Sequence, residues 1–574
     1  MARTVGIGIQ DFETVIENDC FYVDKTKFIK EWWESNDSVT LIARPRRFGK
    51  TLTMSMLEKF FSVKYAGRGG LFENLSIWQE RSPSGDYKYR KLQGTYPVIS
   101  LSFANIKENN FQSAREKICQ LFTDLYVQNF FLRDSEVLTD KDRDYFDRIS
   151  ADMRDSDATM ALNKLSDFMC RYYGKKVILL LDEYDTPVQE AYVNGYWDEL
   201  VSFIRSMFNA AFKTNPWLER GIMTGITRVS KESIFSDLNN LEVVTTTSDK
   251  YADIFGFTEA EVFAAMDEMG LTDKEGVKYW YDGFTFGTTN DIYNPWSVLN
   301  YLDKRKMAAY WANTSSNSLV GKLVREGNKN VKQGFEELLK GKPIRTVIDE
   351  QIVYNQLDDN EEAIWSLLLA SGYLKVVTVD ESAYHDECME EIEYKLTLTN
   401  YEVKRMFASM IRGWFGRTSS DYNDFVKALL LGDIEAMNEY MNRVSEEIFS
   451  FFDTGRRPGK SEPERFYHGF VLGLMVELSG RYRITSNRES GFGRYDVVLE
   501  PNRKEDGSTA GDPIIIEFKV FNPKRDGTLE DTVLAAKKQI EEKGYAKELI
   551  ARGAAEECIR SYGFAFEGKT VLIG

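Results

Sequence analysis

Short runs of apolar residues along the chain predict its buried β-strands. In the first half they cover residues 39–43, 96–103, 176–181 and 221–225, and segments of helical character such as residues 112–161 separate them. This alternation through about residue 300 predicts an α/β core. Residues 301–455 have a mostly helical pattern, and a strongly apolar run at residues 514–520 predicts one more buried strand.

The segment 44–51, Arg-Pro-Arg-Arg-Phe-Gly-Lys-Thr, joins the first predicted strand to a predicted helix. It follows the phosphate-loop template G-x-x-x-x-G-K-[ST], except that Arg44 replaces the first glycine. Gly49 lets the backbone approach phosphate, Lys50 can reach the β- and γ-phosphates of ATP, and the Thr51 hydroxyl can hold Mg²⁺. The helix dipole adds to this anion site. The predicted nucleotide-binding residues of this segment are Arg46, Phe48, Gly49, Lys50, Thr51 and Leu52.

A second candidate motif follows the apolar run at residues 176–181, which ends in Asp182-Glu183. A continuous apolar run of this kind is typical of a parallel strand buried on both faces. In a nucleotide site Asp182 would complete the Mg²⁺ shell and Glu183 would polarise the attacking water. By itself the pattern also fits a core strand followed by a charged turn, and its pairing with the phosphate loop favours the nucleotide site.

The next predicted strand, residues 221–225, runs into Ile226-Thr227-Arg228. In ATPases with an additional strand (ASCE-type), this strand ends in a polar residue near the γ-phosphate. Thr224 or Thr227 could serve as that residue. Arg228 could contact phosphate or form a surface salt bridge, and the sequence leaves both open.

Three residues near the C-terminus predict a second phosphate chemistry. Asp496 lies in Arg-Tyr-Asp, and Glu517 and Lys519 lie in the last predicted strand. Because side chains alternate along a strand, Glu517 and Lys519 share one face. The two carboxylates form a hard-oxygen site for Mg²⁺ or Mn²⁺, and the ammonium group lies beside it, as phosphodiester hydrolysis requires. Glu-x-Lys pairs on strands can also be surface charges.

This pattern resembles the PD-(D/E)XK nuclease superfamily, with its Asp at Asp496, its acidic residue at Glu517 and its Lys at Lys519. Tyr495 stands where the family name has Pro. The resemblance implies two further site residues. Glu464 begins an apolar helical stretch like the one that supplies an upstream Glu in this superfamily, and Gln539 lies on a predicted helix like the one that follows the last metal-binding strand.

Five motifs in order resemble the bacterial AAA-ATPase-like family, whose members commonly carry a C-terminal PD-(D/E)XK-like domain. They lie at residues 21–26, 44–51, 181–187, 225–228 and 293–297. The resemblance covers nearly the whole chain and implies an ATP-binding protein. In this family the phosphate loop typically lacks its first Gly, so Arg44 is a family trait.

The predicted architecture is a multidomain α/β protein. Residues 1–300 form an AAA-like P-loop ATPase domain, residues 301–455 a helical lid and winged-helix-like region, and residues 456–574 a PD-(D/E)XK nuclease-like domain. The helix-strand-strand pattern at residues 361–398 underlies the winged-helix interpretation. Such a unit binds DNA in some proteins and is a structural relay in ATPases, and the lack of an obvious basic recognition helix favours the relay.

Charge and composition limit the partners. The net charge of −17 argues against a chain that binds nucleic acid over its whole surface, but residues 461–574 have a net charge of only −2. The C-terminal domain could therefore accept DNA. Five cysteines without a C-x-x-C pair and the absence of an 18-residue apolar span predict a cytoplasmic protein without membrane contact. A homo-oligomer is compatible with the sequence.

Two functions remain open at this point. In the first, the chain is a metal-dependent nuclease acting on DNA whose cutting is controlled by ATP. In the second, it is a regulatory NTPase switch whose nuclease-like domain is inactive and only binds nucleic acid or a protein partner.

Overall fold

The computed structural model describes residues 3–574 with gaps, and the chain forms two compact units, Met1–Met406 and Phe407–Gly574. The residues outside the description are 83, 228–233, 236–237, 312–319, 321–322, 324–328, 340, 350–356, 358–359, 381–391, 415–421, 449–470, 472–474, 476–477, 479–481, 487–488, 491–492, 495–496, 503–510 and 524. No helix within the described ranges combines the length and apolar character that crossing a membrane needs.

A parallel sheet of five strands in the order β2-β3-β4-β1-β5 forms the centre of the first unit. Its strands are β1 Val39–Ala43, β2 Val98–Ser102, β3 Val177–Asp182, β4 Leu218–Gly225 and β5 Leu241–Val244. The first four confirm the strands predicted from the apolar runs. Every residue of β1 and β3 is buried, as expected for strands covered on both faces. β4 lies between β1 and β3, so the carboxyl ends of these three parallel strands lie side by side.

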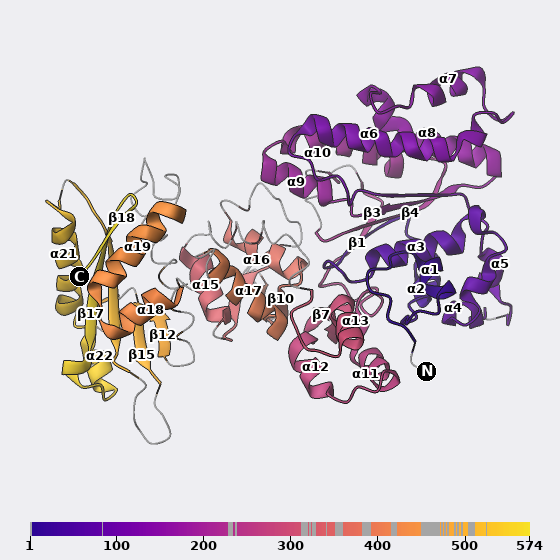
Figure 1. The fold of residues 1–574 in the computed structure, drawn as a ribbon. Coiled ribbons are helices and arrows are strands. Elements are labelled where there is room, and N and C mark those ends of the chain that lie inside the picture. Colours follow the sequence, from indigo (N-terminus) through magenta and orange to yellow (C-terminus); the bar gives the residue numbers. More distant parts are fainter. Residues whose placement is uncertain are drawn as a thin grey trace, which may run out of the picture. The chain divides into compact units, whose positions relative to one another are not determined.

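Helices cover both faces of this sheet (Figure 1). On one side lie α1 Phe12–Glu17, α2 Lys27–Ser35 and α3 Lys50–Phe61, and on the other α8 Asp155–Tyr173, α9 Thr186–Asn194 and α10 Trp197–Phe208. Two short helices, α4 Ser76–Gln79 and α5 Lys88–Leu92, lie between α3 and β2 in sequence. The helix α3 starts directly after the phosphate loop and packs against β2 and β3.

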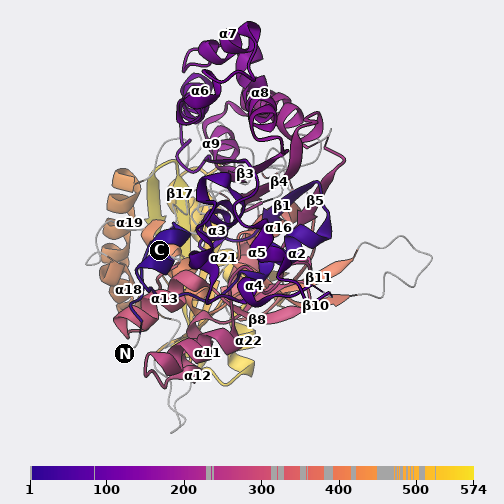
Figure 2. The same cartoon turned by 90° about the vertical axis from the view of Figure 1, so that its right-hand side faces the viewer.

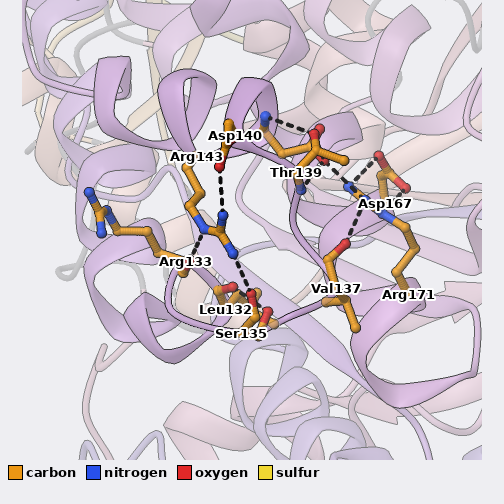
Figure 3. A network of polar contacts seen from close by, with 10 residues as sticks. Leu132, Arg133, Ser135, Val137, Thr139, Asp140, Arg143, Asp167 and Arg171 are labelled. Carbon is orange, nitrogen blue, oxygen red and sulfur yellow. Dashed lines mark hydrogen bonds and ion pairs between the residues drawn. The ribbon is translucent and has the colours of Figure 1, made fainter.

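The long connection between β2 and β3 is helical, as the sequence predicted, and consists of α6 Phe111–Gln128, α7 Asp140–Arg148 and α8. It extends away from the sheet, with α7 at its far end (Figure 2). Two arginines hold the turns there by donating to main-chain carbonyls (Figure 3). Arg143 donates to the carbonyls of Arg133 and Ser135 at 3.1 and 3.0 Å, and Arg171 donates to that of Val137 at 2.9 Å.

The rest of the first unit contains two small antiparallel sheets. The first has the order β6-β8-β7, with β6 Phe257–Thr258, β7 Phe284–Phe286 and β8 Thr289–Tyr293, and packs with α11 Glu259–Glu268, α12 Lys274–Tyr281 and α13 Pro295–Lys304. The second has the order β10-β11-β9, with β9 Ile344–Val347, β10 Leu374–Asp380 and β11 Glu393–Leu398, beside α15 Lys329–Leu339 and α16 Glu361–Ala370. The helix-strand-strand pattern at residues 361–398 is thus confirmed, and its winged-helix role stays a prediction.

A mixed sheet in the order β12-β15-β16-β17-β18 forms the second unit. Its strands are β12 Tyr482–Ser486, β15 Val497–Pro501, β16 Ile514–Val520, β17 Arg560–Glu567 and β18 Thr570–Ile573. Two further short strands, β13 Glu489–Ser490 and β14 Gly493–Arg494, pair antiparallel. Only β16 and β17 are parallel. Among its described residues, this unit has the end of α17 Tyr401–Trp414 and the helices α18 Tyr422–Leu431, α19 Ile434–Ile448, α21 Leu529–Lys543 and α22 Ala546–Ala551.

The two faces of β16 have different partners. Ile514, Ile516 and Phe518 belong to one apolar cluster with residues of α18 and α19. Ile515 belongs to a second cluster with residues of α21 and α22. The helices α18 and α19, which the sequence placed in the middle region, therefore contribute to the core of the C-terminal unit.

Replacing Ile516 tests this arrangement. Because Ile516 is 0 % exposed, Ile516→Ala should lower the free energy of unfolding of the second unit by about 2–5 kcal/mol through lost burial and a cavity. Leu534 on α21 is 63 % exposed, and Leu534→Ala should change it by about 0.5 kcal/mol or less. Amide hydrogen exchange of β16 and β17 in the full chain measures both. Similar effects of the two substitutions would contradict the packing.

Candidate functional site

The phosphate loop connects β1 to the N-terminus of α3. Gly49 is the N-cap of α3 and has a φ of 83°, a left-handed conformation that glycine adopts without a steric penalty. Residues Lys50 and Thr51 then begin the helix, whose first main-chain amides and dipole favour an anion. The predicted strand, turn and helix are thus confirmed, and they give the loop the backbone form of an anion site.

The Lys50 side chain is buried in the loop. It is 5 % exposed, and its Nζ donates to the carbonyl oxygens of Arg44 at 2.9 Å and Pro45 at 2.8 Å. Burial lowers the pKa of Lys50, while the nearby carboxylates of Glu183, Asp182 and Asp185 oppose that shift. The ammonium is therefore held beside the loop, where an incoming phosphate would exchange for carbonyl partners.

Asp182 lies at the centre of the strand ends. Its Oδ2 accepts a hydrogen bond from the Thr51 hydroxyl at 2.6 Å, and its Oδ1 accepts one from the Thr224 hydroxyl. Burial raises the pKa of Asp182, and these two hydrogen bonds counteract the shift. The structure therefore brings together residues from α3, β3 and β4, which the sequence had placed in three separate motifs.

Glu183 follows with a φ of 51°, an uncommon conformation for a residue with a side chain. Its amide donates to the Thr224 hydroxyl at 3.4 Å, and its Oε2 accepts from the Thr186 hydroxyl at 3.1 Å. Of the two threonines left open by the sequence, Thr224 bonds to the Asp182 carboxylate and to the Glu183 amide, and Thr227 bonds to the Asp185 carboxylate.

Asp185 is a buried residue of the site that the sequence analysis did not single out. It is 1 % exposed and its Oδ2 accepts from the amides of Ile226 and Thr227, at 2.9 and 3.0 Å, and from the Thr227 hydroxyl at 3.1 Å. Burial raises its pKa, and the amide hydrogen bonds lower it. Asp185 thus fixes the end of β4 to the turn after β3. A second Asp three residues after Asp182 was the available signal.

Arg44, which stands where the phosphate-loop template has its first glycine, has a structural role. Its side chain is 0 % exposed and donates to the carbonyls of Thr245, Ala43 (3.2 Å) and Lys250 (3.4 Å). Its guanidinium lies 4.3 Å from the centre of the Phe286 ring on β7. The arginine therefore ties the loop to the segment after β5 and to the first small sheet.

The other predicted nucleotide-binding residues that the structure describes are either fully or partly buried. Phe48 is 1 % exposed and packs edge-on against Phe284 and Phe286, with ring centroids 4.8 and 5.5 Å apart. Arg46 is half-buried and donates to the Gln189 side chain at 3.3 Å. Leu52 is half-buried on α3. Arg228 lies outside the described residues.

In the second unit, Glu517, Lys519 and Gln539 come together. Lys519 Nζ donates to Gln539 Oε1 at 2.6 Å, and Gln539 Nε2 donates to Glu517 Oε1. Glu517 is only 3 % exposed. The predicted shared face of Glu517 and Lys519 is thus confirmed, and one amide of α21 joins them. Asp496 and Glu464 lie outside the described residues; in the sequence Asp496 directly precedes β15, whose Val497 pairs with Ile516.

Comparison with known families finds a match over each of the two regions that contain these candidate sites. A model described as "Predicted AAA-ATPase" (AAA-ATPase_like) matches residues 6–235, and the PD-(D/E)XK nuclease superfamily model matches residues 462–574. These two regional matches confirm the resemblance to both families that the sequence motifs indicated. It is similar to an "Uncharacterized protein in vnfD 5'region" of Azotobacter chroococcum mcd 1, with 24 % identity over 562 residues, covering 96 % of this chain and 94 % of the relative.

Restoring the glycine of the phosphate-loop template should damage this protein. Arg44→Gly removes a buried side chain that bonds to three carbonyls, so it should lower the free energy of unfolding of the first unit by about 2–4 kcal/mol. Arg47 is exposed, has a φ of 66° and stacks on Trp296, so Arg47→Gly should cost about 1 kcal/mol or less. Urea unfolding of the full chain measures both. Wild-type stability with tighter ATP binding in Arg44→Gly would contradict this role.

Proposed function

We propose that this chain binds and hydrolyses ATP in its first unit and that its C-terminal domain is a metal-dependent nuclease acting on DNA, with nucleotide state controlling the cutting. The observation that carries the proposal is the convergence of Lys50, Thr51, Asp182 and Thr224 at the ends of adjacent strands. The additional strand β4 between β1 and β3 supports an ASCE-type ATPase.

Nucleotide binding follows from the loop. The amides at the start of α3 would donate to the phosphates, and Lys50 would transfer its hydrogen bonds from the Arg44 and Pro45 carbonyls to the β- and γ-phosphate oxygens. Arg46, which is half-buried, and Arg228 are further candidates for phosphate contacts. Phe48 supports the loop by packing, and Leu52 and Thr227 remain candidate contacts.

The residues for hydrolysis lie beside the loop. Glu183 would orient the attacking water and accept its proton, and the hydroxyl of Thr186 holds that carboxylate. Thr51 and Asp182 offer hard oxygen ligands that fit Mg²⁺, which when bound would neutralise charge on the β- and γ-phosphates. Thr224 orients Asp182 for this role.

Two substitutions separate ATP binding from hydrolysis. Lys50→Ala should weaken ATP binding by at least about 100-fold, because it removes the buried cation at the phosphates. Glu183→Gln should bind ATP normally but lose hydrolysis, since the amide no longer accepts the proton of water. Lys59→Ala is a matched control on α3. Lys59 bonds to Asp11 and Tyr65 and is not part of the phosphate loop, so its loss should leave ATP binding unchanged. Calorimetry and phosphate release measure the outcome, and full-affinity binding by Lys50→Ala would refute the site.

The nuclease proposal rests on the Glu517–Gln539–Lys519 contacts. Asp496 and Glu517 would supply oxygen ligands for Mg²⁺ or Mn²⁺, which when bound would lower the pKa of the attacking water. Lys519 would stabilise negative charge that develops on the phosphodiester, and Gln539 holds Lys519 and Glu517 in register. Glu464 would complete the acidic rim of this site.

Loss of either carboxylate should abolish cutting. Asp496→Ala and Glu517→Gln should reduce metal-dependent DNA cleavage at least about 100-fold, since even outer partners of metal sites are worth about 10- to 100-fold. Glu530→Gln removes an exposed carboxylate at the start of α21 and should leave cleavage unchanged. The test is a digest of linear, nicked, branched and single-stranded DNA, each with no nucleotide, ADP or an ATP analogue. These digests measure both the rate of cutting and its dependence on nucleotide.

Three outcomes of these digests are decisive. Wild-type cleavage that persists in Asp496→Ala would refute the site assignment. Equal rates under all nucleotide conditions would refute the control by ATP. A wild-type protein that binds ATP and cuts no substrate with either metal would favour the alternative, a regulatory NTPase switch with an inactive nuclease-like domain.

A further inference from the structure

The segment Tyr293–Ser297, one of the five motifs in the sequence, lies against the phosphate loop. Asn294 caps α13 by accepting from the Ser297 amide at 3.2 Å, and Pro295 occupies the first turn, where a missing amide proton costs nothing. The Asn294 side chain also donates to the Arg46 carbonyl at 3.4 Å, and the Trp296 ring lies 4.4 Å from the Arg47 guanidinium. The start of α13 thus contacts both arginines at the centre of the loop.

Trp311 contacts the same loop carbonyl from a second direction. Its indole Nε1 donates to the Arg46 carbonyl at 3.0 Å, and the side chain is buried, with 3 % exposed. Its ring packs edge-on against Phe284, which in turn packs against Phe48 of the loop. Trp311 therefore fixes the loop through a hydrogen bond and through a row of aromatic rings.

Glu402 joins these two contacts to α17 Tyr401–Trp414. The carboxylate is 0 % exposed; its Oε1 accepts from the Trp311 amide at 2.7 Å, and its Oε2 accepts from the Ser297 hydroxyl at 2.8 Å. A buried carboxylate with two such donors is costly to displace. The division between the two compact units falls within α17, after Met406.

We propose that Trp311 and Glu402 are positioning residues for the phosphate loop and that they link its conformation to α17. The inference rests on the proposed nucleotide binding, and it assigns the motif at residues 293–297 to holding the loop. Nucleotide that rearranges the loop would change the hydrogen bonds to the Arg46 carbonyl, and the buried Glu402 would pass that change to the first turn of α17. A nucleotide shifts this element only to the extent that it binds one conformation of the loop more tightly than the other.

Trp311→Phe tests the link in the full chain, because it removes the indole donor and keeps an aromatic ring. The affinity for an ATP analogue should fall about 3- to 10-fold, the typical worth of one hydrogen bond. At saturating analogue, hydrogen exchange of residues 401–406 should change in the wild type and no longer change in Trp311→Phe. Trp32→Phe is the matched control, since Trp32 is 0 % exposed and its indole donates to Thr40 at 3.2 Å; it should retain both properties.

Glu402 gives a second pair of variants. Glu402→Gln should preserve the exchange response, because its amide oxygen can still accept from the Trp311 amide. Glu402→Leu should behave like Trp311→Phe. Preservation of the response by Gln and its loss in Leu would show that the hydrogen bond, rather than the volume of the side chain, carries the link.

The results that overturn the inference differ from those that refute ATP binding. An unchanged wild-type exchange pattern at saturating analogue, or an equal response in Trp311→Phe and Trp32→Phe, would overturn the link. Equal affinity of Trp311→Phe and Trp32→Phe for the ATP analogue would refute the positioning role of Trp311. A wild type that binds no analogue would refute the proposed function and this inference together.

Discussion

The hydrogen bonds to the buried Asp182 carboxylate are the interaction on which the candidate nucleotide site of the first unit depends. Asp182 lies at the end of β3 and accepts hydrogen bonds from Thr51 on α3 and Thr224 on β4. An ionised carboxylate is expensive to bury without such donors, so the three elements are held in one arrangement. The same contacts gather hydroxyl and carboxylate groups that phosphate chemistry uses, and the Lys50 ammonium lies near the Asp182 carboxylate. Stability and site geometry therefore have a common source at this edge of the sheet.

Buried polar side chains also hold the rest of the loop. Asp185 fixes the end of β4, Arg44 reaches the carbonyls of Thr245 and Lys250, and Glu402 holds Trp311. Each of them joins segments far apart in sequence, and each satisfies main-chain groups that burial would otherwise leave without water. The phosphate loop is thus supported from several sides. Thr224 and Asp185 likewise hold the turn after β3, where Glu183 keeps an uncommon φ of 51°.

The second unit uses a comparable arrangement on a smaller scale. Glu517 is buried on a strand whose other face is apolar, and Gln539 from α21 joins it to Lys519. Alternation along β16 puts the charged pair on one face, and the covering helix supplies the amide. In both units, a buried carboxylate at a strand is held by donors from a neighbouring helix.

The sequence alone determined the strands at residues 39–43, 96–103, 176–181, 221–225 and 514–520, because runs of apolar residues and their alternation are local properties. It also singled out Lys50, Thr51, Asp182, Glu183, Glu517 and Lys519 as candidate site residues, because their motifs have characteristic spacing. β5, the strand order and the packing of α18 and α19 in the C-terminal core came from the tertiary structure. So did the roles of Arg44, Asp185, Trp311 and Glu402, because their partners are distant in sequence or lie in turns without a distinctive pattern. Long-range burial decides which polar residue meets which partner, and no local pattern records that choice.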